Sequence, residues 1–273
     1  MKATVGTGNG ERGTGTAGNA PFPVPFSLFP LFLSPPAPGW LNMARDQGML
    51  DRAEAESGLM LRLYQWDPPC LSFGRNESVF RRYDRREIER LRLDVVRRPT
   101  GGRAVWHESE ITYAVAGRVN QFGSLSAAYC AIHQFLAAAL SRHGAQVTLA
   151  GKTPVPGFSP GGCFSAPVGG EIMYGNRKLV GSAQLRQGRA FLQHGSILLG
   201  GTQEIVTRVS RVPAPEGRES SLREALGRTV SFEEVADSIL EESGTAPTET
   251  EWLDRAASAH VEHFRSPEWT WRR

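Results

Sequence analysis

The chain has 273 residues, of which 40% are hydrophobic and 22% are charged, so it can bury the core of one large α/β domain or of two small ones. Its formal net charge is only +3, which is too small to indicate a nucleic acid or a membrane surface as a partner. The three cysteines, Cys70, Cys130 and Cys163, are too few and too widely spaced for a disulfide scaffold or a structural zinc site. No run of about 18 apolar residues occurs, so no transmembrane helix is expected. We therefore expect a cytoplasmic protein without a bound metal.

The first residues carry few side chains that a core would bury. Residues 1–20 contain six glycines and four threonines, so residues 1–24 are expected to be a disordered extension. One folded domain is expected over residues 25–273, beginning with a short strand within residues 26–33.

Hydrophobic periodicity predicts the next elements. Asn42 is a good N-cap for a helix over residues 43–56, which Gly58 would end. Leucines alternate with other residues over residues 59–64 and predict a strand. The elements expected next are a polar helix over residues 85–91, a strand at residues 95–96, a loop over residues 98–107 and a strand over residues 111–116.

The clearest predicted helix covers residues 124–143, because its apolar side chains form one stripe that should lie on a sheet. After a strand over residues 146–149 and a Pro/Gly-rich loop over residues 152–162, residues 171–174 are expected to pair with residues 178–183 across Gly175-Asn176. The remaining predicted elements are a strand over residues 191–199, a helix from the capping box at Ser231 to Glu242, and a helix from about residue 249 to residue 264.

Two adjacent glycines interrupt the segment from Arg97 to His107. At Gly101 and Gly102 the missing side chains let backbone N–H groups approach an anion or a carbonyl closely. Arg98 and His107 flank this turn. An ordinary tight turn with surface arginines gives the same pattern, so a functional interpretation needs a second motif.

That second motif begins at Lys178 and continues into Gly181, Ser182 and Ala183. A lysine at the start of an apolar strand can point a desolvated ammonium into a cleft, where it polarises a carbonyl or exchanges protons. His194 and Gly195 lie on the following predicted strand. A solvated lysine at a sheet edge is the alternative interpretation.

Cys163 lies in a Gly-rich loop rather than on an apolar face, whereas Cys70 and Cys130 fit small buried or half-buried residues. With the Lys178 ammonium nearby to favour the thiolate, Cys163 would be a competent acyl-transfer nucleophile. A loop thiol without a role is the alternative.

In their order along the chain, these segments resemble the lipoate-protein ligase and octanoyltransferase superfamily, whose catalytic domain is shared with biotin protein ligases. The resemblance covers about residues 26–273, and its motifs lie at residues 42–46, 63–66, 72–76, 97–107, 163–164, 178–184 and 193–199. It implies an α/β (α+β) fold of mixed, largely antiparallel β-sheets flanked by helices.

Within the superfamily, the sequence from Gly101 to Glu108 is more similar to the cysteine-dependent octanoyltransferases than to the ATP-dependent ligases, which have a third glycine where this chain has Arg103. The Cys163-Phe164 pair is similar to the nucleophile loop of the Gram-positive type of octanoyltransferase. Only 78 residues follow Gly195, so no separate C-terminal accessory domain of the long ligases is expected.

The resemblance implies a two-step acyl transfer that needs no cofactor. Cys163 would take an octanoyl group from octanoyl-acyl carrier protein, and a lysine of a lipoyl domain would then accept it. That lipoyl domain would belong to the glycine cleavage H protein or to a 2-oxoacid dehydrogenase E2 protein. Lys178 would orient the carbonyl and favour the thiolate, and backbone N–H groups near Gly101, Gly102 or Gly181 would stabilise the oxyanion.

Further substrate contacts are expected from the same motifs. An apolar tunnel for the acyl chain would involve Tyr64, Val105 and Val180, each of which could instead pack in the core. His107 and His194 would contact substrate or fix the cleft, and neither is assigned as a general base. The complete set of substrate-binding candidates is Arg98, Gly101, Gly102, His107, Gly181, Ser182, Ala183, His194 and Gly195. No metal site is expected, and the resemblance implies a monomer.

Three other functions stay open at this point. An ATP-dependent lipoate-protein ligase would form a lipoyl-adenylate with Mg²⁺ and would need no cysteine. An amidotransferase would move the octanoyl group between lipoyl domains. A non-catalytic subunit would bind lipoyl domains without turnover.

Overall fold

The computed structural model describes residues 29–151, 170–212 and 219–272. The predicted extension over residues 1–24, the loop over residues 152–162 and Cys163 lie outside the described residues. No helix within the described residues is both long enough and apolar enough to cross a bilayer.

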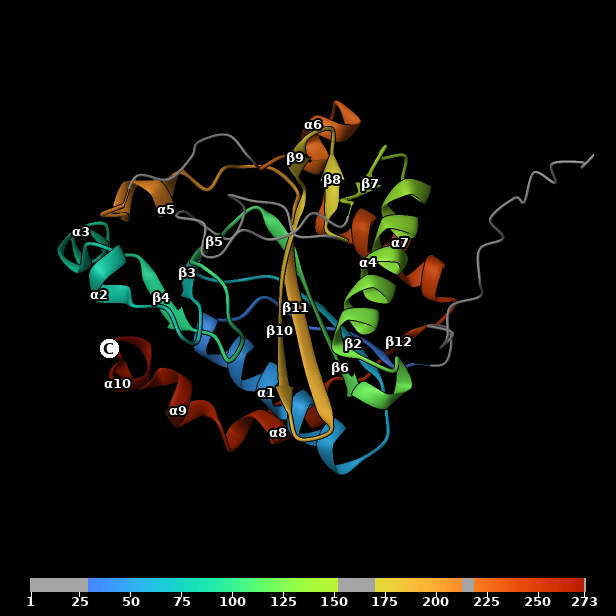
Figure 1. The fold of residues 1–273 in the computed structure, drawn as a ribbon, viewed down its shortest axis with the longest axis horizontal. Helices are drawn as coiled ribbons and strands as arrows, with labels where there is room; N and C mark the ends of the chain where they lie inside the picture. Colours follow the sequence, from blue (N-terminus) through green and yellow to red (C-terminus); the bar gives the residue numbers. More distant parts are fainter. Residues whose placement is uncertain (1–28, 152–169, 213–218, 273) are drawn as a thin grey trace, which may run out of the picture.

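The largest sheet is mixed and mostly antiparallel (Figure 1). Its strands are, in spatial order, β10 (Val180–Gln187), β11 (Ala190–Leu198), β6 (Glu110–Arg118), β2 (Met60–Tyr64), β1 (Leu31–Leu33) and β12 (Pro247–Thr248). The neighbours from β10 to β2 are antiparallel, whereas β1 runs parallel to both β2 and β12. This arrangement confirms the predicted fold class and the strands expected near residues 31, 60, 111 and 191.

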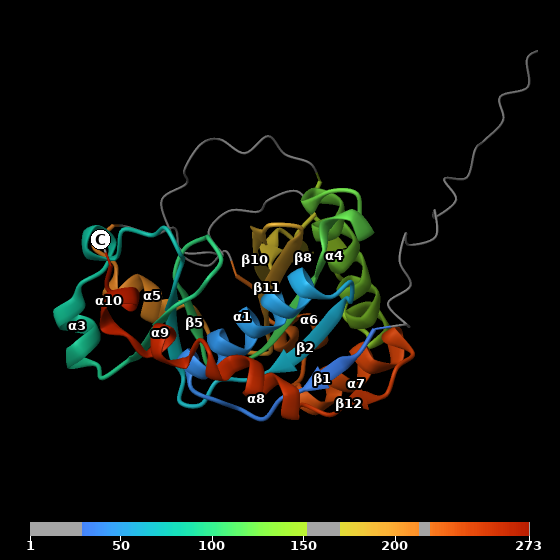
Figure 2. The ribbon, with the colours of Figure 1, turned by 90° about the horizontal axis from the view of Figure 1, so that it is seen from below.

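Helices cover both faces of this sheet (Figures 1 and 2). One core lies between the sheet and the helices α4 (Leu125–Arg142) and α7 (Phe232–Ser243), and a second lies between the sheet and the helices α1 (Gly39–Ala55) and α8 (Glu251–Ser258). Leu61 and Leu63 of β2 enter the first core, while Met60 and Tyr64 enter the second. The alternation that predicts β2 therefore belongs to a strand buried on both faces.

A smaller sheet lies beside the large one, on the left of Figure 1. It contains β4 (Asp94–Arg97), β3 (Cys70–Phe73) and β5 (Val105–His107), and α2 (Val79–Arg82), α3 (Arg85–Arg90) and α5 (Glu204–Val209) surround it. The prediction of a loop over residues 98–107 is wrong for its last three residues, because β5 pairs antiparallel with β3.

A third sheet contains β7 (Thr148–Leu149), β8 (Ile172–Tyr174) and β9 (Arg177–Lys178). The pairing of β8 with β9 confirms the hairpin, whose turn uses Gly175 at a φ of 58°. The prediction that this pairing continues to Ala183 is wrong, because the chain enters the large sheet at Val180 and pairs with β11. The buried Leu179 side chain packs in the main core at the change of sheet.

The start of α1 differs from the prediction. The helix begins at Gly39 after an N-cap at Pro38, so Asn42 lies inside the helix and is not its N-cap. The Asn42 amide donates instead to the carbonyls of Ala37 and Gln65, each at 3.0 Å. Asn42 therefore ties the chain before α1 to the chain after β2. By contrast, the capping box predicted at Ser231 is present at the start of α7.

The helix predicted over residues 249–264 is divided into α8 and α9 (Val261–Arg265). At the break, His260 Nε2 lies 2.7 Å from Asp51 Oδ2 of α1. The break lets both Leu253 and Phe264 pack in the core on the α1 side of the sheet. The other short helices are α6 (Leu222–Leu226), α10 (Pro267–Thr270) and the 3₁₀ helix η2 (Val119–Gln121).

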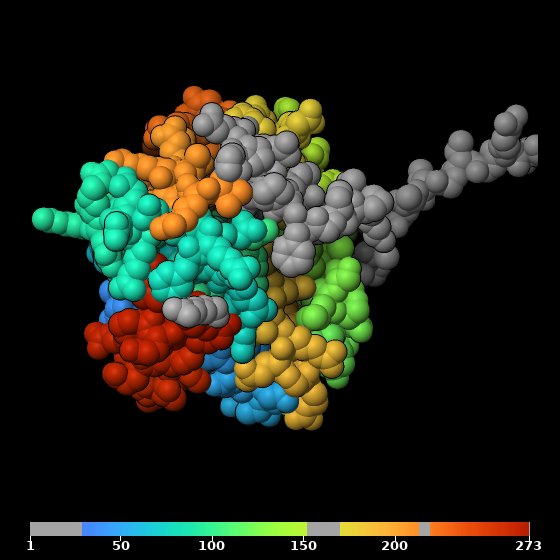
Figure 3. All heavy atoms as spheres, turned by 60° about the vertical axis from the view of Figure 1, so that its left-hand side comes forward, coloured from blue at the N-terminus to red at the C-terminus, as the bar shows by residue number. Residues whose placement is uncertain are grey.

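Arg97 fixes the C-terminal helices against the smaller sheet. Its buried guanidinium donates to the carbonyls of Gly74 and Glu77 on one side and of Thr270 and Arg272 on the other, at 2.9–3.2 Å. Figure 3 shows the corresponding contact at the surface, where the C-terminal segment in red lies against the teal segment that precedes β5. This attachment positions the loop that carries the paired glycines.

Candidate active site

One pocket lies where α1, the large sheet and the smaller sheet meet. Part of its wall is apolar and comes from Met43, Tyr64, Trp66 and Val105. Another part is polar and comes from Ser72, Arg98, His107, Thr112, His194 and Ser196. The backbone of β10 and β11 completes the lining at Gly181, Ser182, Ala183 and Gly195. Such a mixture of an apolar wall and a few convergent polar groups is typical of ligand-binding sites.

The structure brings together seven of the residues predicted from the motifs. These residues are Arg98, His107, Gly181, Ser182, Ala183, His194 and Gly195. Tyr64 and Val105 also line the pocket, whereas Val180 packs in the main core. Gly101, Gly102 and Lys178 are not among the lining residues, and Cys163 lies outside the described residues.

Arg98 holds the paired-glycine loop in place. Its Nη1 donates to the backbone carbonyl and the Oγ of Ser72 at 3.2 and 3.0 Å, and its Nη2 donates to the carbonyls of Gly101 and Arg103 at 2.8 and 2.6 Å. Its Nε also donates to the Gly101 carbonyl, at 3.1 Å. All five guanidinium N–H groups thus have partners within the protein, so Arg98 shapes this side of the pocket.

Gly74 and Gly102 allow the backbone before α2 to lie in close contact with the paired-glycine loop. A Cβ at Gly74 would collide with the carbonyl of Gly102. Gly102 itself has a φ of 91°, a conformation that other residues adopt at a cost. Gly74 and Gly102 therefore serve the shape of the loop, whereas a Cβ at Gly101 would meet no other atom of the described residues.

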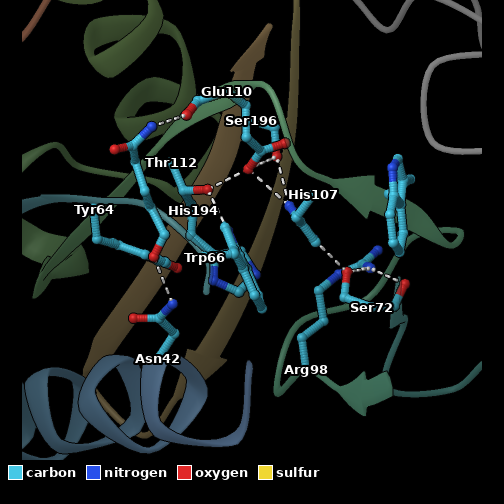
Figure 4. Close-up of polar contacts among 12 residues, drawn as sticks. Asn42, Tyr64, Trp66, Ser72, Arg98, His107, Glu110, Thr112, His194 and Ser196 are labelled. Atoms are coloured by element: carbon cyan, nitrogen blue, oxygen red, sulfur yellow. Dashed lines mark hydrogen bonds and ion pairs between the residues drawn. The ribbon is translucent and has the colours of Figure 1, made fainter. Parts of the chain in front are cut away.

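His107 is held between a carboxylate and a hydroxyl (Figure 4). Its Nδ1 lies 2.7 Å from Glu110 Oε1, and its Nε2 lies 2.7 Å from Ser72 Oγ. The imidazole also stacks on Trp66, with ring centroids 3.9 Å apart. These contacts fix both the position and the orientation of the ring.

His194 has a parallel set of partners. Its Nδ1 lies 2.9 Å from Asp46 Oδ2, and its Nε2 lies 2.6 Å from Thr100 Oγ1. Burial lowers the pKa of His194, so this imidazole is neutral near pH 7. The pocket thus contains two histidines, each bound to a carboxylate and to a hydroxyl.

Lys178 lies away from the pocket lining, in a buried ion pair. Its Nζ is 2.5 Å from Glu171 Oε1, and both side chains are almost fully buried. The alternative of a solvated lysine at a sheet edge is therefore wrong, because β9 is covered at this position. The pair is close enough to His133 for the charge of Lys178 to act on that imidazole.

A polar cluster lies between Lys178 and the pocket. His133 Nε2 lies 2.8 Å from Ser182 Oγ and 3.1 Å from the Tyr113 hydroxyl, while its Nδ1 donates to the Gly170 carbonyl at 2.7 Å. Burial, and to a smaller extent the charge of Lys178, lowers the pKa of His133 to about 4. A neutral His133 therefore orients Ser182 at the pocket wall.

Sequence reasoning missed several of these residues. His133 is a polar residue next to the apolar stripe of α4, and that position is the one signal that could have indicated it. Glu110 follows His107 by three residues and directly precedes the strand predicted over residues 111–116. Asp46 gives no local signal for its contact with His194, because the two are 148 positions apart.

In the described part of the chain, no three His, Cys, Asp or Glu side chains converge so that they could hold a metal ion.

Comparison with known protein families agrees with the resemblance seen in the sequence. Residues 38–244 match the family described as "Lipoyl protein ligase A/B catalytic domain". A curated relative from Moorella thermoacetica, named Octanoyltransferase LipM, is 36% identical over 72% of this chain and 74% of its own length. A protein of the same name from Geobacillus kaustophilus is 31% identical over 88% of this chain and 95% of its own length.

Solved structures with the same fold are lipoate-protein ligases. A lipoate-protein ligase A bound with ATP superposes with a TM-score of 0.75 at 19% identity, covering 89% of this chain and 98% of the ligase. A putative lipoate protein ligase from T. acidophilum with bound lipoic acid gives a TM-score of 0.73 at the same identity and coverage. At this identity the likeness concerns the fold alone.

Proposed function

Because the chain belongs to the lipoyl protein ligase A/B catalytic domain family, we propose that it is an octanoyltransferase of lipoate biosynthesis. In this proposal, the enzyme takes an octanoyl group from octanoyl-acyl carrier protein as a thioester on Cys163 and transfers it to a lysine of a lipoyl domain. The observation that carries the proposal is the 36% identity to Octanoyltransferase LipM over most of both chains.

The pocket supports the proposal because it has both an apolar and a polar surface. Met43, Tyr64, Trp66 and Val105 offer an apolar surface, against which an eight-carbon chain would lose its contact with water. The hydroxyl of Ser182 lies at the same pocket and could hydrogen-bond a thioester carbonyl. The backbone N–H groups around Gly181 are further candidates for stabilising the oxyanion.

Cys163 is proposed as the nucleophile because the Cys163-Phe164 pair is similar to the nucleophile loop of the Gram-positive type of octanoyltransferase, and because Cys70 is unsuitable. Cys70 is fully buried in β3, and burial raises the pKa of its thiol well above the usual value. Cys130 lies on α4, partly buried. Lys178 is proposed to favour the Cys163 thiolate, although its ammonium also pairs with Glu171.

A thioester is already an activated acyl group, so the proposed transfer consumes no ATP and needs no cofactor. We place the reaction in the cytoplasm, because a free catalytic thiol must stay reduced. The exposed Arg81 and Arg86 are proposed to contact the acidic carrier protein. The acceptors are lipoyl domains of the H protein or of E2 proteins, and the enzyme acts as a monomer.

The proposal is tested by mixing the enzyme with octanoyl-acyl carrier protein and an isolated lipoyl domain, and by following the mass of the lipoyl domain. We expect octanoylation without ATP in the wild type and none in Cys163→Ala. If Cys163→Ala still modifies the lipoyl domain when ATP, Mg²⁺ and lipoate are supplied, the chain is a ligase instead. If both proteins bind the lipoyl domain but neither modifies it under any condition, the enzymatic proposal is wrong.

A further inference from the structure

The two pocket histidines, both labelled in Figure 4, have the same kinds of partner but different electrostatic surroundings. Each imidazole contacts a carboxylate through Nδ1 and a hydroxyl through Nε2. Which of them can accept a proton depends on whether its carboxylate is already neutralised by another charge.

The Asp46 carboxylate beside His194 is already neutralised. Arg62 Nη1 lies 2.8 Å from Asp46 Oδ1, and neither side chain is exposed to solvent. The hydroxyl of Tyr64 donates to Asp46 Oδ2 at 2.8 Å. A proton on His194 would therefore add a second buried positive charge to a pair that is already balanced, which is unfavourable.

The Glu110 carboxylate beside His107 has no such cation. Among the described residues, the hydrogen-bond partners of its Oε1 are His107, Thr112 and Ser196, and no Lys or Arg forms an ion pair with it. Its Oε2 is buried without any hydrogen-bond partner in the described part of the chain. A proton on His107 would thus give Glu110 the counter-charge that it lacks.

The hydrogen bonds around His107 can be assigned as a continuous relay from Arg98 to Glu110. Arg98 can only donate, and it donates from Nη1 to Ser72 Oγ at 3.0 Å. Ser72 then donates its hydroxyl proton to His107 Nε2, and His107 Nδ1–H donates to Glu110. With these directions, the lone pair at His107 Nε2 points at a hydroxyl that lines the pocket and can accept its proton.

From this arrangement we propose that His107 accepts, through Ser72, the proton that the acceptor lysine must lose before it attacks the acyl thioester. Glu110 acts through His107 and is a positioning residue that stabilises the imidazolium. The inference rests on the proposed function, and it assigns a role to one half of that reaction, the transfer from enzyme to lysine.

The protons and bonds of this step balance as follows. The lysine enters as an ammonium, and one of its protons passes to Ser72 Oγ while the Ser72 hydroxyl proton moves to His107 Nε2. The freed nitrogen lone pair forms the N–C bond to the acyl carbon. The C–S bond then breaks with its electron pair on sulfur, and the second nitrogen proton goes to that sulfur. The products are the amide, a thiol and a His107 imidazolium that returns its proton to solvent.

Several other titratable groups face this relay from the surrounding elements. Arg98 comes from the loop after β4, Tyr64 from β2, Cys70 from β3 and His194 from β11. Burial raises the pKa of Tyr64 and of Cys70 and lowers the pKa of His194, so these three stay neutral near pH 7. A pH-dependent difference between the wild type and a Glu110 variant therefore does not arise from titration of these three groups.

The test uses the full-length protein loaded with octanoyl from octanoyl-acyl carrier protein and then separated from the donor. Discharge of the acyl-enzyme is followed by mass spectrometry with two acceptors, a lipoyl domain and hydroxylamine. The lipoyl-domain lysine is protonated at neutral pH, whereas the hydroxylamine nitrogen is not, so only the lysine needs a proton acceptor. The variant is Glu110→Gln, which has the shape of glutamate without the charge.

For Glu110→Gln we expect discharge to the lipoyl domain at pH 7 to be about 100-fold slower than in the wild type, a magnitude typical of general-base catalysis. The difference should shrink as the pH is raised, because more of the lysine is then deprotonated by solvent. Discharge to hydroxylamine should match the wild type. Ser72→Ala, a change on a different strand, should give the same acceptor-specific loss, and it replaces Glu110→Gln if that variant does not fold.

Equal discharge to the lipoyl domain in variant and wild type at pH 7 would overturn the inference. So would a loss that is the same for both acceptors at every pH, because that pattern indicates damage to the pocket and not a missing proton acceptor. Neither result affects the proposed function. A wild type that takes up no octanoyl group would overturn the proposed function, and this inference with it.

Discussion

Asp46 of α1 and Arg62 of β2 form an ion pair of 2.8 Å in which neither side chain is exposed to solvent. Arg62 also bonds Ser34 Oγ at 2.8 Å and Asn42 Oδ1 at 2.7 Å, so its guanidinium joins three segments beneath the pocket. Removing one partner of a buried pair leaves an uncompensated charge.

We therefore expect Arg62→Met to lower the free energy of unfolding by about 3–5 kcal/mol, measured by urea denaturation at pH 7. The double variant Asp46→Asn/Arg62→Met should lose less than the sum of the two single variants, because no charge is left unpaired. As a control, Arg142→Ala removes a pair on the surface and should cost no more than about 1 kcal/mol. Additive losses in the double variant would show that the pair is not coupled.

Gly195 is expected to be intolerant of any side chain. A Cβ at this position would lie 2.6 Å from the Gly181 carbonyl oxygen and 2.8 Å from Tyr113 Cε1, and closer still to Ser182 Oγ. Gly195→Ala should therefore push β10 away from β11 at the pocket, destabilise the protein by about 1–3 kcal/mol and reduce octanoyl transfer. The matched control is Gly58→Ala, because the space around Gly58 is open. Thermal unfolding of both variants, with a transfer assay, tests this expectation, and a fully active, stable Gly195→Ala would contradict it.

His133 should make the stability depend on pH in the acid range. Burial lowers its pKa to about 4 in the folded protein, whereas an unfolded histidine has a pKa near 6.5. The unfolded state therefore binds the proton first, so the stabilising contribution of a neutral His133 is complete above about pH 6.5 and is lost as the pH falls toward 4.

The difference between the two pKa values corresponds to a loss of about 3 kcal/mol in the free energy of unfolding as the pH falls through this range. We expect the wild type to lose more stability between pH 7 and pH 4.5 than His133→Gln, as measured by urea denaturation at each pH. The same loss in both proteins would mean that His133 does not titrate in the folded state as its burial implies.

Cys70 should be unreactive toward alkylating reagents in the folded protein. Its side chain is fully buried, and burial, followed by the charge of Asp94, raises the pKa of its thiol, so little thiolate is present. In Cys163→Ser, iodoacetamide should leave Cys70 unmodified under native conditions and alkylate it once urea unfolds the chain. Rapid native alkylation of Cys70, located by peptide mass spectrometry, would reopen the question of which cysteine is the nucleophile.

The elements that could be predicted from the sequence are those in which the pattern of apolar residues reflects which side chains of the element are buried. The apolar stripe of α4 and the alternation in β2 both have this origin. The turn at Gly102 and the Gly195 position could also be predicted, because a positive φ at Gly102 and close backbone contact at Gly195 both require glycine.

The predictions that failed depend on contacts between distant parts of the chain. Asn42 has the right chemistry for an N-cap, but its amide binds carbonyls on both sides of the helix start. The pairing within the hairpin does not continue to Val180, because β10 pairs along its whole length with β11. The partners of His194 were missed for the same reason, since Asp46 and Thr100 are far from His194 in sequence.

The central claim is that Cys163 carries the octanoyl group, and intact mass spectrometry tests it most directly. The purified protein is mixed with octanoyl-acyl carrier protein in the absence of ATP, and the wild type is compared with Cys163→Ser. The account predicts one octanoyl adduct on the wild type, removed by hydroxylamine, and no adduct on Cys163→Ser. The absence of any adduct, together with labelling of a lipoyl domain that requires both ATP and lipoate, would contradict the account and identify the chain as a ligase.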